Sequence, residues 1–140
     1  MKKIYLFLIF ILALGLTKSN ASHIAGGEIY YRYIGDSTLI PNQYLIETRL
    51  YRDASPGSAS MPTTLTINVC SSCYSTSNVN LPLTGGGPGS FVPTLFDCVN
   101  PGSPGTVSLE YYIYKGTYTL PGTCADFTFN YNNCCRNPNI

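Results

Sequence analysis

The chain has 140 residues, with eight basic and seven acidic side chains, and therefore a formal net charge of +1 at pH 7. This balance excludes the basic surface that nucleic-acid binding needs, so we expect no nucleic-acid partner. The chain contains one histidine and no tryptophan. A serine or cysteine nucleophile would therefore lack its usual base.

The first 21 residues have the organisation of a secretory signal peptide. Two lysines precede an apolar run from Ile4 to Leu16, and the small-residue site Ser19-Asn20-Ala21 follows. The run is shorter than the roughly 20 residues that a membrane-spanning helix needs. We therefore expect export across the inner membrane, contact with the membrane only during export, and a mature chain that begins at Ser22. Three lysines leave with the signal, so five basic and seven acidic residues remain and the net charge becomes −2.

Apolar and polar residues alternate along most of the mature chain, which is the pattern of half-buried strands. In residues 64–70, for example, Leu65, Ile67 and Val69 share one face. Similar runs occupy residues 28–34, 43–52, 107–114 and 125–131, separated by clusters of turn-forming residues. About seven short strands predict a single all-β domain over residues 22–140. We expect an antiparallel, immunoglobulin-like β-sandwich, with a small barrel as the alternative.

Two turn-rich segments are the candidates for binding loops. They run from Asp53 to Met61 and from Thr84 to Ser90, and the second contains four glycines. Both are long enough to vary without disturbing a core, so we expect any ligand contacts there.

All six cysteines lie in the mature part of the chain: Cys70, Cys73, Cys98, Cys124, Cys134 and Cys135. An even number of cysteines in an exported domain indicates structural disulfides. We expect Cys70 and Cys73 to form a local ring. Cys98 and Cys124 would then pair with Cys134 and Cys135, each adjacent cysteine finding a separate partner because neighbouring strand residues point to opposite faces.

Two other uses of the cysteines remain open. The Cys70-Ser71-Ser72-Cys73 spacing occurs in thioredoxin-like redox motifs, but a polar, helix-poor segment follows it here. A zinc site would need a second pair of similar spacing, whereas Cys134 and Cys135 are adjacent. We therefore favour structural disulfides and expect neither a metal nor another cofactor.

The remaining polar residues single out no catalytic site. His23 beside a free terminal amine could hold copper, although a polar chain terminus explains it more simply. Glu28, Glu47 and Glu110 each lie in a strand pattern, where a solvated face accounts for them. The aspartates are scattered and form no calcium-binding loop. We therefore expect a protein that is not an enzyme.

Tyrosine is the one excess that indicates binding, with eleven of twelve outside the signal segment. The doublets Tyr30-Tyr31 and Tyr111-Tyr112 place one ring on each face of a strand, so we expect about half of the tyrosines in the core. The others could form an adhesive or sugar-stacking surface.

Three motifs carry a resemblance to a known family. Residues 22–33 (SHIAGGEIYYRY), 50–53 (LYRD) and 134–137 (CCRN) resemble the N-terminal module of large, secreted, gliding-motility-associated proteins of Bacteroidetes. The resemblance spans nearly the whole mature chain and implies export, a cell-surface setting and a β-rich module ahead of repeat domains and a sorting domain. It brings no catalytic residue. Ala54 stands where the family often has a cysteine, and the last motif lies close to Ile140, so we expect either a fragment of a longer protein or a stand-alone module.

The sequence therefore favours a secreted or cell-surface structural module that acts in adhesion, with a surface glycan or a protein as its partner. A glycan-binding module is the second hypothesis, and a secreted hydrolase is the third. Exposed aromatic rings lining one groove would favour the second, and two facing carboxylates in a cleft would favour the third.

Overall fold

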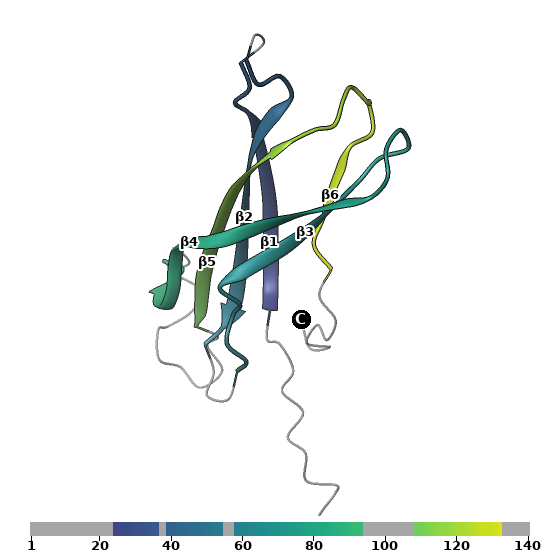
Figure 1. Cartoon of the computed structure of the whole chain (residues 1–140). Helices are drawn as coiled ribbons and strands as arrows, with labels where there is room; N and C mark the ends of the chain where they lie inside the picture. Colours follow the sequence, from purple (N-terminus) through teal and green to yellow (C-terminus); the bar gives the residue numbers. More distant parts are fainter. Residues whose placement is uncertain (1–23, 37–38, 55–57, 94–107, 133–140) are drawn as a thin grey trace, which may run out of the picture.

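The computed structural model describes residues 24–36, 39–54, 58–93 and 108–132. This part of the chain is all-β and consists of β1 (Ile24–Tyr33), β2 (Gln43–Asp53), β3 (Thr64–Cys70), β4 (Ser77–Phe91), β5 (Leu109–Thr119) and β6 (Thr128–Asn130). The strands pair antiparallel in the order β1-β2-β5-β4-β3-β6 (Figure 1). The predicted all-β, antiparallel class is confirmed.

The signal segment expected at residues 1–21 lies outside the described residues. Within the described ranges, no helix has the length and hydropathy to cross a membrane.

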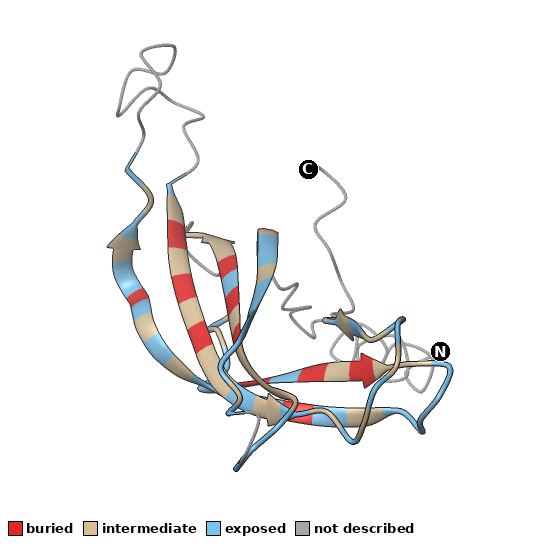
Figure 2. Ribbon diagram, turned by 90° about the horizontal axis from the view of Figure 1, so that it is seen from above, coloured by how far each residue is buried: buried red, intermediate tan, exposed pale blue. Residues whose placement is uncertain are grey.

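Strand β4 changes partners halfway along its length, and this change shapes the sheet. Its first part, Ser77 to Pro82, pairs with β3, and the part from Leu83 onward pairs with β5. Pro82 has no N–H to donate and lies where one pairing ends and the other begins, a position at which a strand tolerates proline. The sheet bends there, so that β3 and β4 cross over β1, β2 and β5 (Figures 1 and 2).

The two halves of the bent sheet share one core. Its buried hydrophobic side chains come from four strands: Ile46, Leu50, Leu65, Ile67, Val69, Val79, Leu81, Tyr112 and Tyr114. Along β3 and β5 buried positions alternate with more exposed ones, as Figure 2 shows, because successive strand residues point to opposite faces. The strand periodicity of residues 64–70 is therefore confirmed, with Leu65, Ile67 and Val69 on the core face.

Gly27 of β1 allows a core side chain to lie against the backbone. It pairs with Leu50, and a Cβ atom built at Gly27 would lie 2.6 Å from Leu50 Cδ2 and 3.1 Å from the Arg49 carbonyl oxygen. A Cβ atom at the neighbouring Gly26 would meet no atom of the described residues within 4 Å. The two adjacent glycines therefore have different roles, and only Gly27 is required by packing.

The expected loop from Thr84 to Ser90 is instead part of β4, and the sequence prediction was wrong there. Gly86 pairs with Tyr112 at positive φ (71°), and a Cβ atom at Gly86 would lie 2.2 Å from the Tyr111 carbonyl oxygen. The register shifts on both sides of Gly86, as in a bulged strand. The glycines that indicated a loop therefore serve close backbone approach and bulging within a strand.

One disulfide joins Cys73 to Cys124, with 6.1 Å between their Cα atoms. The expected Cys70–Cys73 ring is wrong, as is the pairing of Cys124 with one of the last two cysteines. Cys70 forms no disulfide within the described residues. Cys98, Cys134 and Cys135 lie outside those residues. The disulfide ties the β3–β4 connection to the β5–β6 connection, where the Tyr74 and Phe127 rings stack 5.9 Å apart.

Replacing Gly27 by alanine should destabilise the fold by about 1–3 kcal/mol, because the added methyl group overpacks Leu50 and the β2 backbone. Urea unfolding monitored by tyrosine fluorescence measures the change. Gly26→Ala is the matched control and should stay within about 0.5 kcal/mol of the unchanged chain. Equal losses in both variants would contradict the packing role of Gly27.

Reduction of the Cys73–Cys124 bond should lower the free energy of unfolding by about 4 kcal/mol, given a sequence separation of 51 residues. The physical reason is that the bond restricts the unfolded chain. Peptide mapping without reductant should recover a peptide in which Cys73 is linked to Cys124. The double variant Cys73→Ser, Cys124→Ser measures the loss of stability without a reductant. Recovery of a Cys70–Cys73 peptide would contradict this pairing.

Candidate functional site

Aromatic rings from four strands meet at one end of the core-facing side of the sheet. The antiparallel register places Tyr33, Tyr44 and Tyr118 directly opposite one another on β1, β2 and β5. Residues opposite each other in an antiparallel pair share a face, so the three rings gather on one side. We call this cluster, together with Tyr31 and with Phe129 of β6, the aromatic surface.

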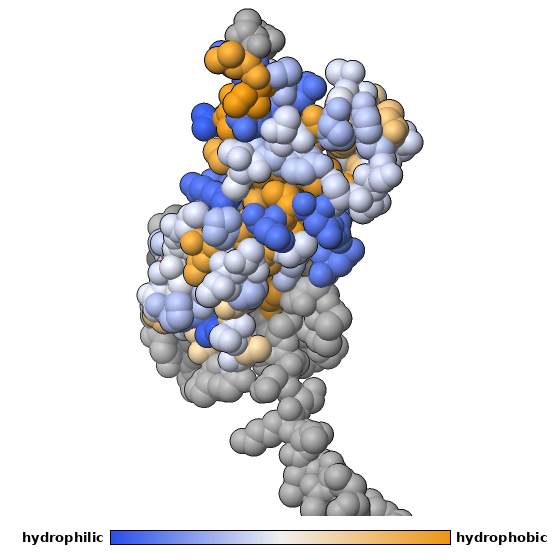
Figure 3. Space-filling view, viewed as in Figure 1, coloured by the Kyte–Doolittle hydropathy of each residue, from blue (hydrophilic) through white to orange (hydrophobic). Residues whose placement is uncertain are grey.

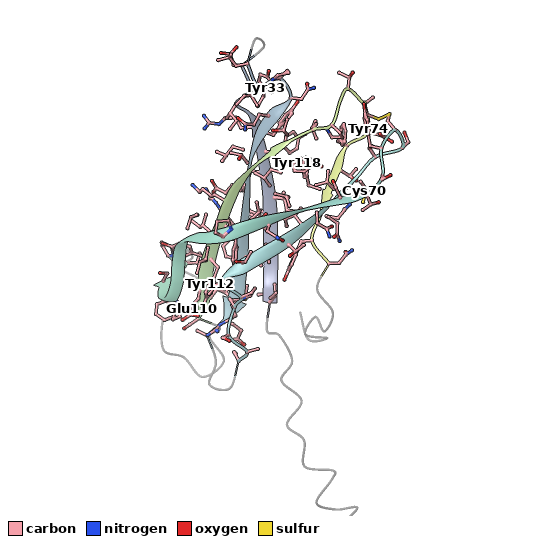
Figure 4. All side chains as sticks on the ribbon, in the orientation of Figure 1. Tyr33, Cys70, Tyr74, Glu110, Tyr112 and Tyr118 are labelled. Carbon is pink, nitrogen blue, oxygen red and sulfur yellow. A yellow bond between two sulfur atoms is a disulfide. The ribbon has the colours of Figure 1, made fainter. Side chains whose placement is uncertain are left out.

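The rings of the aromatic surface are in mutual contact. The Tyr44 ring lies 5.4 Å from Tyr33 and 6.3 Å from Tyr31 between centroids, both edge to face. Phe129 lies 5.8 Å from Tyr31 and 6.4 Å from Tyr118, so β6 contributes to a cluster otherwise made by the opposite half of the sheet. The Tyr118 hydroxyl is hydrogen-bonded to Ser77 Oγ at 2.5 Å. Figure 4 shows Tyr33 and Tyr118 on the same end of the molecule. These contacts pack the rings against one another.

The aromatic surface is open to solvent at the β1 side. Tyr31 is 65% exposed and Tyr33 is 50% exposed, although both project from the face that packs the core. The turn that follows β1 exposes two further apolar side chains, Leu39 (81% exposed) and Ile40 (47% exposed). Figure 3 shows hydrophobic residues at this tip of the β1–β2 hairpin. Several large exposed side chains at one end of the molecule indicate an interaction site more strongly than a single exposed residue does.

The burial of the tyrosines differs from the expectation. Of the eleven described tyrosines, Tyr112 and Tyr114 are buried, which is fewer than the half expected from strand alternation. Burial raises the pKa of Tyr114 to about 12, and its hydroxyl donates to the Pro62 carbonyl oxygen at 2.8 Å. Both doublets divide between the two faces of their strands as expected, with Tyr31 and Tyr112 on the core side. Tyr31 is nevertheless exposed, because it lies on the edge strand β1.

A buried ion pair lies at the other end of the core. Arg52 Nη2 lies 3.0 Å from Glu110 Oε2, and the two side chains are 13% and 7% exposed. Glu110 also accepts hydrogen bonds from the Gly89 N–H at 2.8 Å and the Tyr112 hydroxyl at 3.0 Å. The Gly89 N–H, then the Tyr112 hydroxyl and Arg52, lower the pKa of Glu110 in spite of its burial. Figure 4 shows Glu110 and Tyr112 close together at this end.

This ion pair connects the two predicted binding segments. Arg52 Nη1 donates to the Ala59 carbonyl oxygen at 2.9 Å, within the segment from Asp53 to Met61. Glu110 holds Gly89, within the stretch from Thr84 to Ser90. The structure therefore brings the two segments to the same end of the sheet, opposite the aromatic surface. Asp53 is the last residue of β2, Met61 packs against the core, and Thr84 and Ser90 lie within β4.

The other carboxylates considered in the sequence lie on the outer face of the sheet. Glu47 Oε1 accepts from Arg49 at 2.7 Å, and Glu47 Oε2 lies 2.9 Å from Lys115. Hydrogen bonds from Lys115 and Arg49 lower the pKa of Glu47. Glu28 accepts from Tyr51 at 3.1 Å and from Tyr30. Glu47 and Glu110 are thus kept ionised by their partners, which suits ion pairs and does not suit a general acid.

The disulfide also bears on metal binding. Within the described residues, Cys73, Cys124 and Asp126 place their ligand atoms within 4.8 Å of one another. The two sulfurs are bonded to each other, however, and a metal requires thiolates. Asp126 accepts from the Ser72 N–H through both oxygens, at 3.0 and 3.2 Å. In this oxidised state the cluster does not fit a zinc ion. His23, the copper candidate, lies outside the described residues.

Sequence reasoning located the tyrosine excess but did not identify the aromatic surface. The signal available was the i, i+2 spacing of Tyr31 and Tyr33, which places both rings on one face of a strand. Tyr44, Tyr118 and Phe129 could be added only from the strand order and register, because they lie far apart in the sequence.

Replacing Glu110 by glutamine should cost about 3–5 kcal/mol, because Arg52 would keep a buried charge without its partner. Lys115→Gln, which breaks an exposed pair, should cost at most about 1 kcal/mol and serves as the control. The pKa of Glu110 is lower in the folded than in the unfolded state, so its contribution is present at neutral pH and is lost as the pH falls below about 4.5.

Unfolding free energies measured between pH 3 and pH 7 test both parts of this prediction. The free energy of unfolding of the unchanged chain should rise with pH over the acidic range. In Glu110→Gln this rise should be smaller. An unaltered pH dependence would show that the ion pair does not contribute to stability.

Comparison with known proteins identified no relative of this chain. No protein-family model, no curated protein and no solved structure matches the chain.

Proposed function

We propose that the chain is a non-catalytic, exported surface module that adheres to its partner through the aromatic surface. The observation that carries this proposal is the exposure of Tyr31 and Tyr33 in a rigid cluster built from four strands. Exposed rings held by a sheet lose little conformational entropy on binding, and tyrosine offers both an apolar face and a hydroxyl group.

The charges support a role without catalysis. Glu47 and Glu110 have lowered pKa values and are engaged in ion pairs. A hydrolase of the glycosidase type needs one carboxyl group whose pKa is raised. The geometry of these two carboxylates therefore supports a structural use.

The module belongs, in this proposal, to the immunoglobulin-like β-sandwiches. One core lies between the two halves of a bent antiparallel sheet, which supports this assignment over a closed barrel. The Cys73–Cys124 disulfide suits an oxidising compartment outside the inner membrane. Together with the signal-like residues 1–21 and the resemblance to gliding-motility-associated modules, it supports delivery to the cell surface.

A surface glycan is the second candidate partner. Sugar rings stack on exposed aromatic faces, and the phenolic hydroxyls of Tyr31 and Tyr33 could bond to sugar hydroxyls. The edge-to-face arrangement of Tyr33 and Tyr44 favours an irregular apolar partner over a flat sugar chain, because it provides no continuous planar platform. We therefore place a protein or apolar surface first.

Tyr31→Ser should weaken adhesion about tenfold, whereas Tyr30→Ser should leave it nearly unchanged. The two residues are adjacent and similarly exposed, but only Tyr31 belongs to the aromatic surface. Beads coated with the exported chain are allowed to settle on apolar-coated and on hydrophilic glass, and the fraction retained under flow is measured. Equal retention of the two variants would contradict the proposal.

Two further measurements separate the alternatives. Retention of the chain on insoluble cellulose or chitin, lost in Tyr31→Ser, together with no preference for apolar glass, would establish glycan binding instead. Reproducible turnover of a glycan or an ester, abolished by changing one carboxylate, would overturn the non-enzymatic proposal.

A further inference from the structure

Among the described strands, β1 leaves one edge of the sheet unpaired. It is the first strand in the order β1-β2-β5-β4-β3-β6 and pairs only with β2 among the described strands. Its exposed residues include Glu28, Tyr30, Tyr31, Arg32 and Tyr33. An exposed edge of this length presents backbone donors and acceptors to another strand.

The register shows which backbone groups face outward. The Ile34 N–H donates to the Gln43 carbonyl oxygen at 2.9 Å, so this pair is of the hydrogen-bonded kind. Such pairs alternate along an antiparallel ladder, so Arg32, Tyr30 and Glu28 also direct their backbone groups toward β2. The odd-numbered residues Ile29, Tyr31 and Tyr33 therefore direct theirs to the open edge.

We propose that a second copy of this chain binds at this edge, with the two β1 strands antiparallel and related by a two-fold axis at Tyr30. Ile29 and Tyr31 then form hydrogen-bonded pairs with Tyr31 and Ile29 of the second copy, using the outward-facing backbone groups. The two sheets join into one continuous sheet across the axis. Such a self-complementary contact is the commonest arrangement of homodimers.

Charge complementarity selects this register. With the axis at Tyr30, Glu28 lies opposite Arg32 of the second copy, and Arg32 lies opposite Glu28, in pairs whose side chains approach closely. Arg32 is exposed and makes no ion pair within the described part of the chain. The Glu28 carboxylate accepts hydrogen bonds from Tyr30 of the same strand and from Tyr51 of β2.

The neighbouring registers lose these pairs. With the axis at Ile29, Glu28 lies opposite Tyr30, and with the axis at Tyr31 it lies opposite Ile34.

This inference is independent of adhesion, because it depends on the backbone edge and on outer-face charges. The association constant, measured by sedimentation over a range of chain concentrations at low salt, tests it. Arg32→Glu should weaken dimerisation at least tenfold, since it creates two like-charged pairs. Exchanging both charges, in Glu28→Arg with Arg32→Glu, should restore it to within about threefold.

Lys115→Glu is the matched control, because it makes the same charge reversal on the outer face of β5, two strands away from the edge. It should leave dimerisation nearly unchanged. A chain that stays monomeric at millimolar concentration, or a double exchange that is no better than Arg32→Glu alone, would overturn the proposal.

A cross-link tests the position of the axis. Tyr30→Cys should form an intermolecular disulfide under mild oxidation, because residues opposite each other at the axis lie about 4.5 Å apart between Cα atoms. Thr117→Cys, an exposed position on β5, should show only the background of the native cysteines. Equal cross-linking of both variants would overturn the register.

Discussion

The structure depends on the change of partner in β4. Because Ser77 to Pro82 pair with β3 and the rest of the strand pairs with β5, one strand belongs to both halves of the sheet. The halves therefore bend toward each other and bury Leu81 and Ile67 of one against Ile46 and Tyr114 of the other. A sheet without this change would expose one apolar face, and burial of that face is the main source of stability.

Bending the sheet also gives its two ends different chemistry. At one end the core buries polar groups, and buried polar groups need partners. Glu110 therefore pairs with Arg52 and accepts a hydrogen bond from the Gly89 N–H. At the other end the rings of Tyr31 and Tyr33 extend past the core to the edge and remain at least half exposed. The first arrangement fixes backbone segments in place, and the second leaves rigid rings available for contact.

The two outermost strands, β1 and β6, are held in different ways. β6 is a short strand, and the Cys73–Cys124 bond and the stacked Tyr74 and Phe127 rings tie the connection before it to the β3–β4 turn. Phe129 can therefore stay against Tyr31, across the opening between the halves. β1 has no such tie on its outer side among the described residues, so its backbone edge and its charged face remain available to a partner.

Local pattern alone determined five of the strands, the all-β class and the core face of β3, because alternation of side chains is a property of each strand. It missed β4, because Pro82 and four nearby glycines resemble a loop, and only pairing with β3 and β5 explains them. It also mispaired Cys70 and Cys73, since disulfide partners are set by distances between segments far apart in the chain. The aromatic surface likewise needed the register of β1, β2 and β5, which is decided by how all the apolar faces pack at once. The sequence by itself thus determined where five strands lie and which residues of β3 face inward, and the tertiary structure decided which strands meet.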